Sequence, residues 1–432
     1  MPKNVFRNEP RANRRNFLKA AAVAVASPLV LSSAVLGKDG VIAPSEKIVT
    51  AMVGYGSEGR SIMGGFLTDR LSFKVVAVCD CYKKHLDEGI ARVNGHYKNS
   101  DCKGYARYEE LYQREDIDAI AIATPDHWHT KLSVEACRAG KDVYCEKPLT
   151  LTPLENRQIV AAARKYNRVC TSGSQRVMED YGYMAPVIQS GAIGEITEAV
   201  FTEGRPLATD FYGPKEQIPE GLDWDRWLGP APLGHYNSER ASGNYGGGWR
   251  RLWDYCNGFL ADWGAHKLGG LLYCAGIDHL EPVEIIPNPG GTQEHPAGLT
   301  LIYNNNGKII KVRHHAAGGR DFHVRFIGTE GTYEHHKDRG RILPLKQVDV
   351  RRYSGGATWI HADFDYCVHN RLRPFQDFFY GATTAIALQL ANIAYKVQRP
   401  LKWDAEKTQF IGDEQANRFV SRPKRSPYEI HV

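Results

Sequence analysis

The stretch IVTAMVGYGSEGR, residues 48–60, is the clearest indication of the fold. A short apolar run ends at three glycines in GxGxxG spacing, Gly54, Gly56 and Gly59, and helix-compatible residues follow. Glycines at this spacing let a backbone turn approach a pyrophosphate, whose charge is then held at the N-terminus of the helix. The spacing alone is a weak signal, because a glycine-rich turn without a ligand looks the same. The neighbouring sequence has to distinguish the two.

The next apolar run, FKVVAVCD at residues 73–80, favours the dinucleotide-binding interpretation. It ends at Asp80, 26 positions after Gly54, near the spacing expected for an acid that binds the adenosine ribose. A carboxylate at that position repels a 2′-phosphate, so the sequence predicts NAD in preference to NADP. Ser57 and Glu58, inside the glycine-rich turn, are predicted to contact the same cofactor.

Apolar strands alternate with amphipathic helices through the rest of the first half. Strands are expected within 118–125, 142–148 and 168–175, and helices within 129–140 and 152–166. This alternation predicts a parallel sheet covered on both faces, in which ligands bind at the carboxyl ends of the strands. The residues at these ends are therefore candidate cofactor or active-site residues: Thr124, Pro125, His127, His129, Glu146, Lys147 and Gln175.

After residue 176 the pattern changes to short runs of alternating polar and apolar residues, separated by Gly and Asn turns. This predicts a large, open, mainly antiparallel sheet with one face solvated or covered in a dimer. The helical stretch 385–398 is expected to pack back against the first domain. The fold class is thus α/β, with an N-terminal Rossmann dinucleotide-binding domain and a C-terminal α+β domain.

The N-terminal segment NRRNFLKAAAVAVASPLVLSSAVLG, residues 13–37, resembles a twin-arginine (Tat) export signal, with an ordinary basic segment as the alternative. Its apolar run is too short and too rich in alanine for a stable membrane span. Export of a folded protein predicts a periplasmic location, either released or held by a retained N-terminal anchor. Residues 1–37 carry five of the six net positive charges, so the rest of the chain is close to neutral. Nothing therefore suggests a nucleic-acid partner.

The roughly 395 residues after the signal exceed the usual size of one domain, and 42% of the chain is apolar, enough for full cores. The expected boundaries are a signal at 1–37, a linker at 38–45, an NAD-binding domain at 46–175, a substrate-binding and oligomerisation domain at 176–384, and a C-terminal helix and tail at 385–432.

Nine cysteines, an odd number, are interpreted as small buried hydrophobic residues rather than as a disulfide set. Cys79 and Cys81 have no matching second pair of ligands, so no metal site is expected. The histidine pairs at 314–315 and 335–336 are predicted to be solvated strand or turn residues.

A stretch rich in Gly, Trp, Tyr and Arg lies at residues 235–266. Aromatic faces stack on sugar rings and arginines bind hydroxyl groups, so this composition indicates a carbohydrate pocket. The alternative is a loop whose tryptophans fill a domain interface, which is the preferred interpretation for Trp224 and Trp227. The candidate substrate residues are Arg176, Tyr245, Trp249, Arg250 and Trp253.

Three motifs make the interpretation more specific: ATPDHWH at 123–129, EKP at 146–148 and DWGAH at 262–266. Together with the tail at 403–430, they resemble the Gfo/Idh/MocA family of nicotinamide-dependent sugar oxidoreductases, over residues 46–430. The resemblance implies that Lys147 reaches the reacting hydroxyl, that His266 is the acid/base and that Asp262 orients the sugar. It also implies an open sheet that forms homodimers or homotetramers.

The chemistry of these residue types agrees with those roles. Asp262 and His266 are four positions apart, so on a helix they share one face. Hydride transfer from a carbinol carbon needs a base for the hydroxyl proton, and a lysine stabilises the developing alkoxide. A lone DxxxH is more often a surface pair or a metal site, so the catalytic interpretation depends on its partnership with EKP.

Free nicotinamide cofactor is scarce outside the cytoplasm, so an exported member is expected to carry bound NAD and return each hydride to a second substrate. The primary hypothesis is an NAD-dependent sugar or glycoside dehydrogenase that forms a 3-keto glycoside. The second is a glycosidase that uses transient oxidation, elimination and reduction. In that exported family type, the α-N-acetylgalactosaminidases, other residues replace the EKP lysine and DWGAH, whereas this chain keeps both. The third is a non-catalytic sugar-binding protein.

Overall fold

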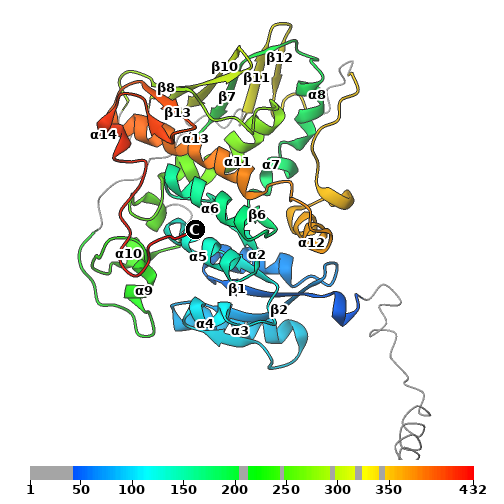
Figure 1. The fold of residues 1–432 in the computed structure, drawn as a ribbon, viewed down its shortest axis with the longest axis vertical. Coiled ribbons are helices and arrows are strands. Elements are labelled where there is room, and N and C mark those ends of the chain that lie inside the picture. Colours follow the sequence, from blue (N-terminus) through cyan, green and yellow to red (C-terminus); the bar gives the residue numbers. More distant parts are fainter. Residues whose placement is uncertain (1–41, 204–212, 244–247, 292–296, 317–323, 340–345) are drawn as a thin grey trace, which may run out of the picture. The chain divides into compact units, whose positions relative to one another are not determined.

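The glycine-rich stretch begins a six-stranded parallel sheet with the order β3-β2-β1-β4-β5-β6 (Figure 1). The computed structural model describes residues 42–203, 213–243, 248–291, 297–316, 324–339 and 346–432, so the N-terminal signal prediction lies outside the described residues. The strands are β1 (Ile48–Val53), β2 (Phe73–Cys79), β3 (Lys103–Tyr105), β4 (Ala119–Ile122), β5 (Asp142–Cys145) and β6 (Cys170–Ser172).

Helices between these strands cover both faces, as the alternation predicted. They are α2 (Ser57–Phe66), α3 (Lys83–Tyr97), α4 (Tyr108–Tyr112), α5 (Asp126–Arg138) and α6 (Pro153–Lys165). Helix α5 begins at Asp126, three positions before the predicted start at residue 129. His127 and His129 therefore lie in the first turn of a helix and not in the loop at the strand end. The Rossmann architecture is confirmed.

The second sheet has eight strands in the order β12-β11-β7-β10-β9-β8-β13-β14. All of its strand pairs are antiparallel except β7 with β10, which is parallel. The prediction of a large, mainly antiparallel sheet is confirmed. Its strands are β7 (Ile196–Thr202), β8 (Glu284–Pro287), β9 (Leu299–Asn305), β10 (Lys308–His315), β11 (Val324–Gly328), β12 (Thr332–Glu334), β13 (Leu401–Asp404) and β14 (Gln409–Phe410).

Two long apolar helices, α11 (Gly258–Cys274) and α13 (Phe378–Val397), lie against the second sheet and against each other (Figure 1). Helix α13 also contacts the first sheet's helix α6, where Asn156 Nδ2 donates to Gln389 Oε1 at 2.6 Å. Residues 48–432 form one compact unit, and one of the apolar clusters among the described residues includes side chains of both sheets. The second half of the chain is thereby fixed against the strand ends of the first.

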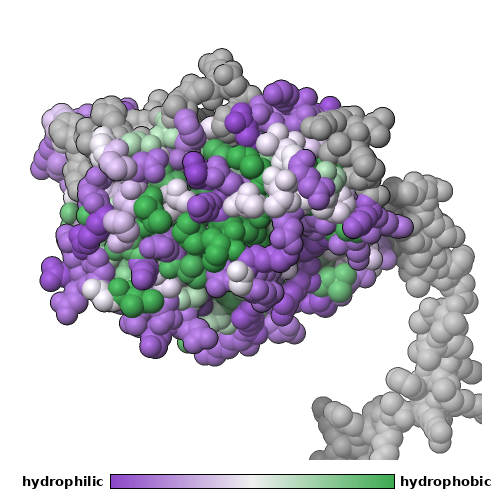
Figure 2. All heavy atoms as spheres, turned by 90° about the horizontal axis from the view of Figure 1, so that it is seen from above, coloured by the Kyte–Doolittle hydropathy of each residue, from purple (hydrophilic) through white to green (hydrophobic). Residues whose placement is uncertain are grey.

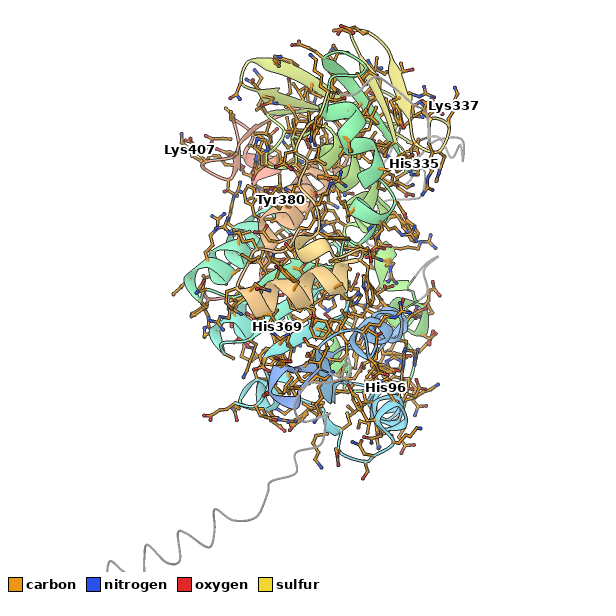
Figure 3. The ribbon with its side chains drawn as sticks, turned by 90° about the vertical axis from the view of Figure 1, so that its right-hand side faces the viewer. His96, His335, Lys337, His369, Tyr380 and Lys407 are labelled. Carbon is orange, nitrogen blue, oxygen red and sulfur yellow. The ribbon has the colours of Figure 1, made fainter. Side chains whose placement is uncertain are left out.

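The shorter helices are α7 (Arg176–Glu179), α8 (Ala185–Gln189), α9 (Trp224–Leu228), α10 (Ser238–Ala241), α12 (Ile360–Asn370) and α14 (Glu414–Asn417). Helix α12 contacts the start of β2, because Ser72 Oγ lies 2.7 Å from His369 Nε2 and its backbone N–H donates to Asp365 at 3.0 Å. Figure 3 shows α12 with His369 labelled.

The outer face of the second sheet carries apolar side chains. The strand register places Ile286, Ile302 and Ile309 on this face, with Ile309 49% exposed. Figure 2 shows an apolar cluster on this face, surrounded by polar side chains. Buried and exposed residues alternate along β10, so its buried side chains lie on the opposite, inner face of the sheet.

All nine cysteines are unbridged, and all except Cys81 are buried, as predicted. The histidine prediction is only half right. His315 and His336 are exposed, but His314 and His335 are buried and lie near the carbonyls of Glu203 and Asp180. His314 and His315 face opposite sides of β10, whereas His335 and His336 lie in the turn that follows β12. Among the described residues, no helix has the length and apolar character needed to cross a membrane.

Candidate active site

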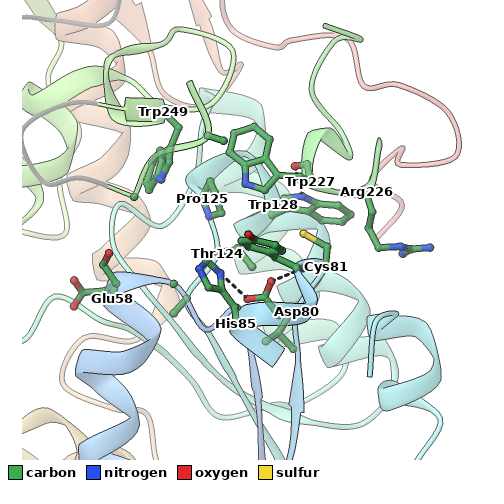
Figure 4. A pocket seen from close by; sticks show the side chains of 18 of the residues that line it. Glu58, Asp80, Cys81, His85, Thr124, Pro125, Trp128, Arg226, Trp227 and Trp249 are labelled. Carbon is green, nitrogen blue, oxygen red and sulfur yellow. Dashed lines mark hydrogen bonds and ion pairs between the residues drawn. The ribbon is translucent and has the colours of Figure 1, made fainter. Parts of the chain in front are cut away.

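A cavity of about 370 Å³ lies at the carboxyl ends of β1, β2, β4 and β5 (Figure 4). This is where ligands bind in open parallel sheets. Most of the predicted cofactor residues line it: Gly54, Gly56, Ser57, Glu58, Asp80, Thr124, Pro125, Glu146 and Lys147.

The glycine-rich turn has the shape that a dinucleotide requires. Gly54 has a φ of 89°, and a Cβ on it would lie 2.7 Å from the carbonyl oxygen of Ala123. A Cβ on Gly59 would lie 2.3 Å from the carbonyl oxygen of Gly54, so this glycine lets α2 pack closely on the turn. Gly56 lines the cavity and has open space where its Cβ would be. The turn therefore leaves room for a pyrophosphate at the N-terminus of α2.

The carboxylate of Asp80 is held in place by the backbone. The N–H groups of Tyr55 and Tyr82 donate to its two oxygens at 2.7 and 2.8 Å, and His85 Nδ1 lies 3.7 Å away (Figure 4). Burial raises the pKa of Asp80, while His85 and the two N–H donors lower it and favour the charged form. A fixed carboxylate at the end of β2 fits a ribose with two free hydroxyl groups.

Four predicted cofactor residues lie outside the lining of the cavity: Gly59, which lies in the glycine-rich turn, and His127, His129 and Gln175. His127 Nε2 lies 3.1 Å from the carbonyl oxygen of Trp227, and burial lowers the pKa of His127 to about 3. His129 connects two loops. Its Nδ1 lies 2.9 Å from the carbonyl oxygen of Pro148, and its Nε2 lies 2.9 Å from the carbonyl oxygen of Thr124. Gln175 precedes α7 and its carbonyl accepts from Tyr353.

Lys147 and Asp262 meet at the inner end of the cavity. Lys147 Nζ donates to Asp262 Oδ1 at 2.6 Å, and Arg250 Nε lies 3.4 Å from Asp262 Oδ2. All three side chains are nearly buried, with exposed fractions of 11%, 3% and 5%. Burial alone would lower the pKa of Lys147, but the carboxylates of Asp262 and Glu146 outweigh burial and hold that pKa above its ordinary value. The lysine therefore stays positively charged.

His266 lies one helical turn after Asp262 on α11, as the four-residue spacing predicted. Burial lowers its pKa well below the ordinary value, and the positive charges of Lys147, Arg176 and Lys267 lower it further. Its Nδ1 is buried and has no hydrogen-bond partner among the described residues. A neutral imidazole of this kind is ready to accept a proton.

The predicted substrate residues are placed in different surroundings. Trp249 and Arg250 line the cavity, with the Arg250 guanidinium 4.3 Å from the centre of the Trp249 ring. Trp253 does not line it; Arg422 and Lys396 cover its ring at 3.8 and 4.6 Å. Arg176 is exposed, pairs with Asp180 at 2.9 Å and lies over the ring of Trp263. Tyr245 lies outside the described residues.

The structure adds Asp126 to the site. Its side chain is 1% exposed and lines the cavity near Lys147, and the Cys256 thiol hydrogen-bonds to it. Burial raises the pKa of Asp126 to about 8, although the hydrogen bond from Cys256 lowers it. Burial, together with the charge of Glu58, likewise raises the pKa of Glu146 to about 8. Asp126 directly follows Pro125 in the ATPDHWH motif, which is the signal that could have identified it.

The second half of the chain also contributes to the cavity. Leu222, Trp227 and Tyr236 line it, although sequence reasoning placed Trp227 only at a domain interface. Trp224 is buried and stacks on Trp227 with ring centres 4.6 Å apart, in agreement with that interpretation. No pattern in the sequence indicated that residues from this segment face the nucleotide-binding loops.

Known proteins share this fold. Aldose-aldose oxidoreductase from Caulobacter crescentus, complexed with glycerol, superimposes with a TM-score of 0.56 at 16% identity, covering 83% of this chain and 100% of that one. The WlbA dehydrogenase from Bordetella pertussis, in complex with NADH and UDP-GlcNAcA, gives a TM-score of 0.57 at 15% identity, with coverage of 83% and 99%. At these identities the similarity shows a shared fold.

Over 212 aligned residues, this chain is 28% identical to a glycosyl hydrolase family 109 protein of Shewanella baltica. The alignment covers 43% of this chain and 44% of that protein. The match thus spans less than half the length of this curated relative. Residues 48–174 match the family described as "Oxidoreductase family, NAD-binding Rossmann fold", and residues 211–430 match "Oxidoreductase family, C-terminal alpha/beta domain". The chain therefore belongs to the Gfo/Idh/MocA family of oxidoreductases, with an NAD-binding Rossmann domain followed by the family's C-terminal domain.

Proposed function

We propose that this protein oxidises a secondary hydroxyl of a sugar or glycoside to a ketone, with NAD as the hydride acceptor and a 3-keto glycoside as the product. The observation that carries the proposal is the meeting of Lys147, Asp262 and His266 beside the dinucleotide cavity. This places a fixed positive charge and a neutral base near one another in a largely buried site.

Side chains of this protein accept the hydroxyl proton and stabilise the charge that develops on the oxygen. Neutral His266 accepts the hydroxyl proton as the C–H bond gives up its hydride, so that one proton and one hydride leave the carbinol group. Lys147 stabilises the negative charge that develops on the oxygen, because its raised pKa keeps it protonated. Asp262 holds the lysine in position through their 2.6 Å contact and binds a neighbouring hydroxyl.

Trp249 and Arg250 are proposed to bind the sugar, with Arg176 and Tyr245 as further substrate contacts. Trp249 and Arg250 line the cavity, and the guanidinium lies against the indole ring. An aromatic face and a guanidinium suit a ring with several hydroxyl groups. The test is a panel of sugars and glycosides with the purified protein, read by NADH absorbance and product mass. A non-catalytic sugar-binding protein would leave bound NAD oxidised with every member of the panel.

The N-terminal segment supports the further proposal of Tat-dependent export to the periplasm, with NAD loaded before export. In that compartment the enzyme returns the hydride to a second carbonyl substrate and does not release its cofactor. Fractionation of cells that express the full chain tests the location. Twin-lysine substitution at Arg14 and Arg15 should retain the protein in the cytoplasm.

A glycosidase with a redox-neutral cycle is the second candidate. The matches to glycosyl hydrolase family 109 proteins favour it. Against it, the chain keeps the lysine of EKP and the DWGAH segment. Product analysis separates the two: the glycosidase releases the aglycone with no net change in NAD, whereas the dehydrogenase yields an intact ketone-containing glycoside.

We further propose that the outer face of the second sheet joins copies of the chain into a homodimer or homotetramer. The support is the apolar cluster on that face, which includes Ile286, Ile302 and Ile309 (Figure 2). Light scattering should give a multiple of the chain mass, and Ile302→Lys should reduce it. A monomeric wild-type protein would contradict the proposal.

A further inference from the structure

Residues 213–243, here called the strap, belong to the C-terminal half of the chain but form a wall of the dinucleotide cavity. Leu222, Trp227 and Tyr236 of the strap line the cavity together with the Rossmann residues Asp80 and Tyr82. Figure 4 shows Trp227 and Arg226 on the same side of the pocket as Asp80 and Cys81, with Glu58 and Trp249 on the other side. The strap therefore faces the part of the cavity marked by the ribose-binding carboxylate.

The backbone of the strap pairs with the Rossmann domain immediately after Asp80. Lys83 N–H donates to the carbonyl of Gly221 at 2.9 Å, and Asp223 N–H donates to the carbonyl of Cys81 at 3.0 Å. These two bonds flank an antiparallel bridge between Tyr82 and Leu222. The loop that holds Asp80 and the strap are thus joined by the main chain itself.

Side chains add a second attachment around α9. Arg226 Nη1 donates to both carboxylate oxygens of Glu109 at 3.2 Å, and the Arg226 side chain is 16% exposed. The carbonyl of Trp227 accepts from Trp128 Nε1 at 3.1 Å. Gly229 lies so close to the Trp128 ring that a Cβ on it would be 2.1 Å from a ring carbon. The strap and α5 are closely packed at this point.

The C-terminal tail holds the middle of the strap. Arg425 donates to the carbonyls of Asp225 and Gly229 at 2.7 and 3.0 Å, and its own N–H donates to the carbonyl of Pro230 at 3.1 Å. Tyr428 packs edge-on against Trp128, with ring centres 5.2 Å apart. Backbone, α9 and tail therefore attach the strap at three places.

We propose that the strap encloses the adenosine half of bound NAD, with Leu222 and Trp227 as cofactor-contacting residues, and that NAD leaves only when the strap separates from the Rossmann domain. Exchange of the nucleotide is then limited by the loss of the Lys83–Gly221 and Asp223–Cys81 bonds and of the Arg226–Glu109 pair. This gives the closed hydride cycle of the proposed function a physical cause, but it does not depend on which sugar is oxidised.

A reversible crosslink tests the proposal most sharply. Tyr82 and Leu222 form a non-hydrogen-bonded antiparallel pair, whose Cα atoms lie at a spacing of about 4.5 Å that a disulfide can bridge. The double variant Tyr82→Cys/Leu222→Cys is purified with its nucleotide and oxidised. Exchange of bound NAD for isotopically labelled NAD is then followed by mass spectrometry after rapid desalting, before and after reduction.

The oxidised form should exchange NAD at least about tenfold more slowly than the same protein after reduction, a factor that corresponds to about 1.4 kcal/mol. The single variant Tyr82→Cys, given the same oxidant, should show no such difference. Equal rates for the oxidised and reduced double variant overturn the proposal. Failure of the crosslink to form does so too, because it contradicts the pairing on which the strap depends.

Arg226→Ala provides an independent arm that should speed exchange by about tenfold or more, the effect expected for losing a charge-assisted pair. Arg399→Ala is the matched control, since Arg399 makes a two-bond pair with Asp413 in the C-terminal half at 2.8 Å for each bond. Equal rates of NAD exchange in the two variants would contradict the proposal that the strap limits exchange. Slow exchange of NAD without oxidation of any sugar would contradict the proposed function but would still support the role of the strap in holding NAD.

Discussion

Lys147 Nζ lies 2.6 Å from Asp262 Oδ1, although the two residues are 115 positions apart in the chain. Lys147 follows β5 of the Rossmann domain, and Asp262 lies in the second turn of α11 in the C-terminal domain. The site is therefore assembled only when the two halves of the chain pack together. Removing one partner of a buried pair costs about 3–5 kcal/mol when it leaves a charge uncompensated, but Arg250 lies 3.4 Å from Asp262 Oδ2 and remains beside it in a Lys147 variant.

Hydride transfer should be lost in Lys147→Met and in His266→Ala while NAD remains bound. Both residues are proposed to act at the sugar oxygen, and neither lies in the glycine-rich turn. We expect the rate of NAD reduction to fall by at least about 10²-fold, the scale of removing a positioned proton-transfer group. The measurement is single-turnover absorbance of NADH, with bound nucleotide quantified in parallel.

Arg399→Ala, remote from the cavity-lining residues, serves as the activity control for these two variants. Near-normal rates in both site variants would show that the roles given to Lys147 and His266 are wrong. Loss of bound nucleotide along with activity would instead indicate a wider disturbance of the cavity.

Asp80 should select NAD over NADP. Asp80→Ser combined with Lys84→Arg removes the carboxylate and places a guanidinium on the adjacent helix, so the ratio of NADP to NAD affinity should rise by about tenfold or more. Titration of nucleotide-free protein with each dinucleotide measures the ratio. Wild-type protein that binds NADP as well as NAD would contradict this role of Asp80.

Local patterns allowed much of the fold and part of the site to be predicted. The turn at residues 54–59 and Asp80 belong to one βαβ unit, so their relative positions follow from the geometry of adjacent strands. The DxxxH spacing likewise became one face of α11. The positions of these residues were predictable because neighbours in sequence are neighbours in space.

Long-range packing could not be predicted in the same way. Trp249 and Trp253 looked equivalent as sugar-stacking residues, but only Trp249 lines the cavity, since Arg422 of the C-terminal tail lies over Trp253. Asp126 was not singled out from the sequence, because its burial and its contact with Cys256 depend on a segment more than 100 positions away. Trp227 reaches the cavity through the strap, whose pairing with the loop after β2 has no counterpart in either local sequence.

Gly56 and Gly59 should respond differently to the same substitution. Gly56→Ala adds a methyl group to open space beside the cavity, so the melting temperature should stay near that of the wild type while NAD affinity falls by at least about tenfold. Gly59→Ala forces a Cβ against the Gly54 carbonyl and should lower the melting temperature of the nucleotide-free protein. Calorimetry and nucleotide titration of both variants check this. Equal loss of stability in the two would contradict the description of the turn.

Asp126 should make stability depend on pH with a defined sign. Its folded-state pKa of about 8 lies above the ordinary value of 3.8, so the folded protein keeps a proton that the unfolded chain releases between these values. The free energy of unfolding therefore falls as pH rises through this window. Asp126→Asn removes this contribution, so the variant should gain stability relative to the wild type from about pH 4 to about pH 8.

Thermal unfolding of the nucleotide-free proteins across this range measures the difference. Asp116→Asn is the control, because a hydrogen bond from Arg114 lowers the pKa of Asp116 and confines its effect to more acidic solutions. A stability difference for Asp126→Asn that does not change with pH would mean that this carboxyl titrates normally.

In the proposed closed cycle, the protein keeps its NAD and passes each hydride from one sugar to another carbonyl substrate. The most direct measurement combines extraction of bound nucleotide from protein recovered from the periplasm with a two-substrate assay in cofactor-free buffer. We expect close to one NAD(H) per chain, and turnover of a donor glycoside with an acceptor ketosugar without added cofactor. Protein that is recovered empty, and whose rate depends on added NAD, would contradict the closed cycle and indicate a dehydrogenase that exchanges its cofactor at every turnover.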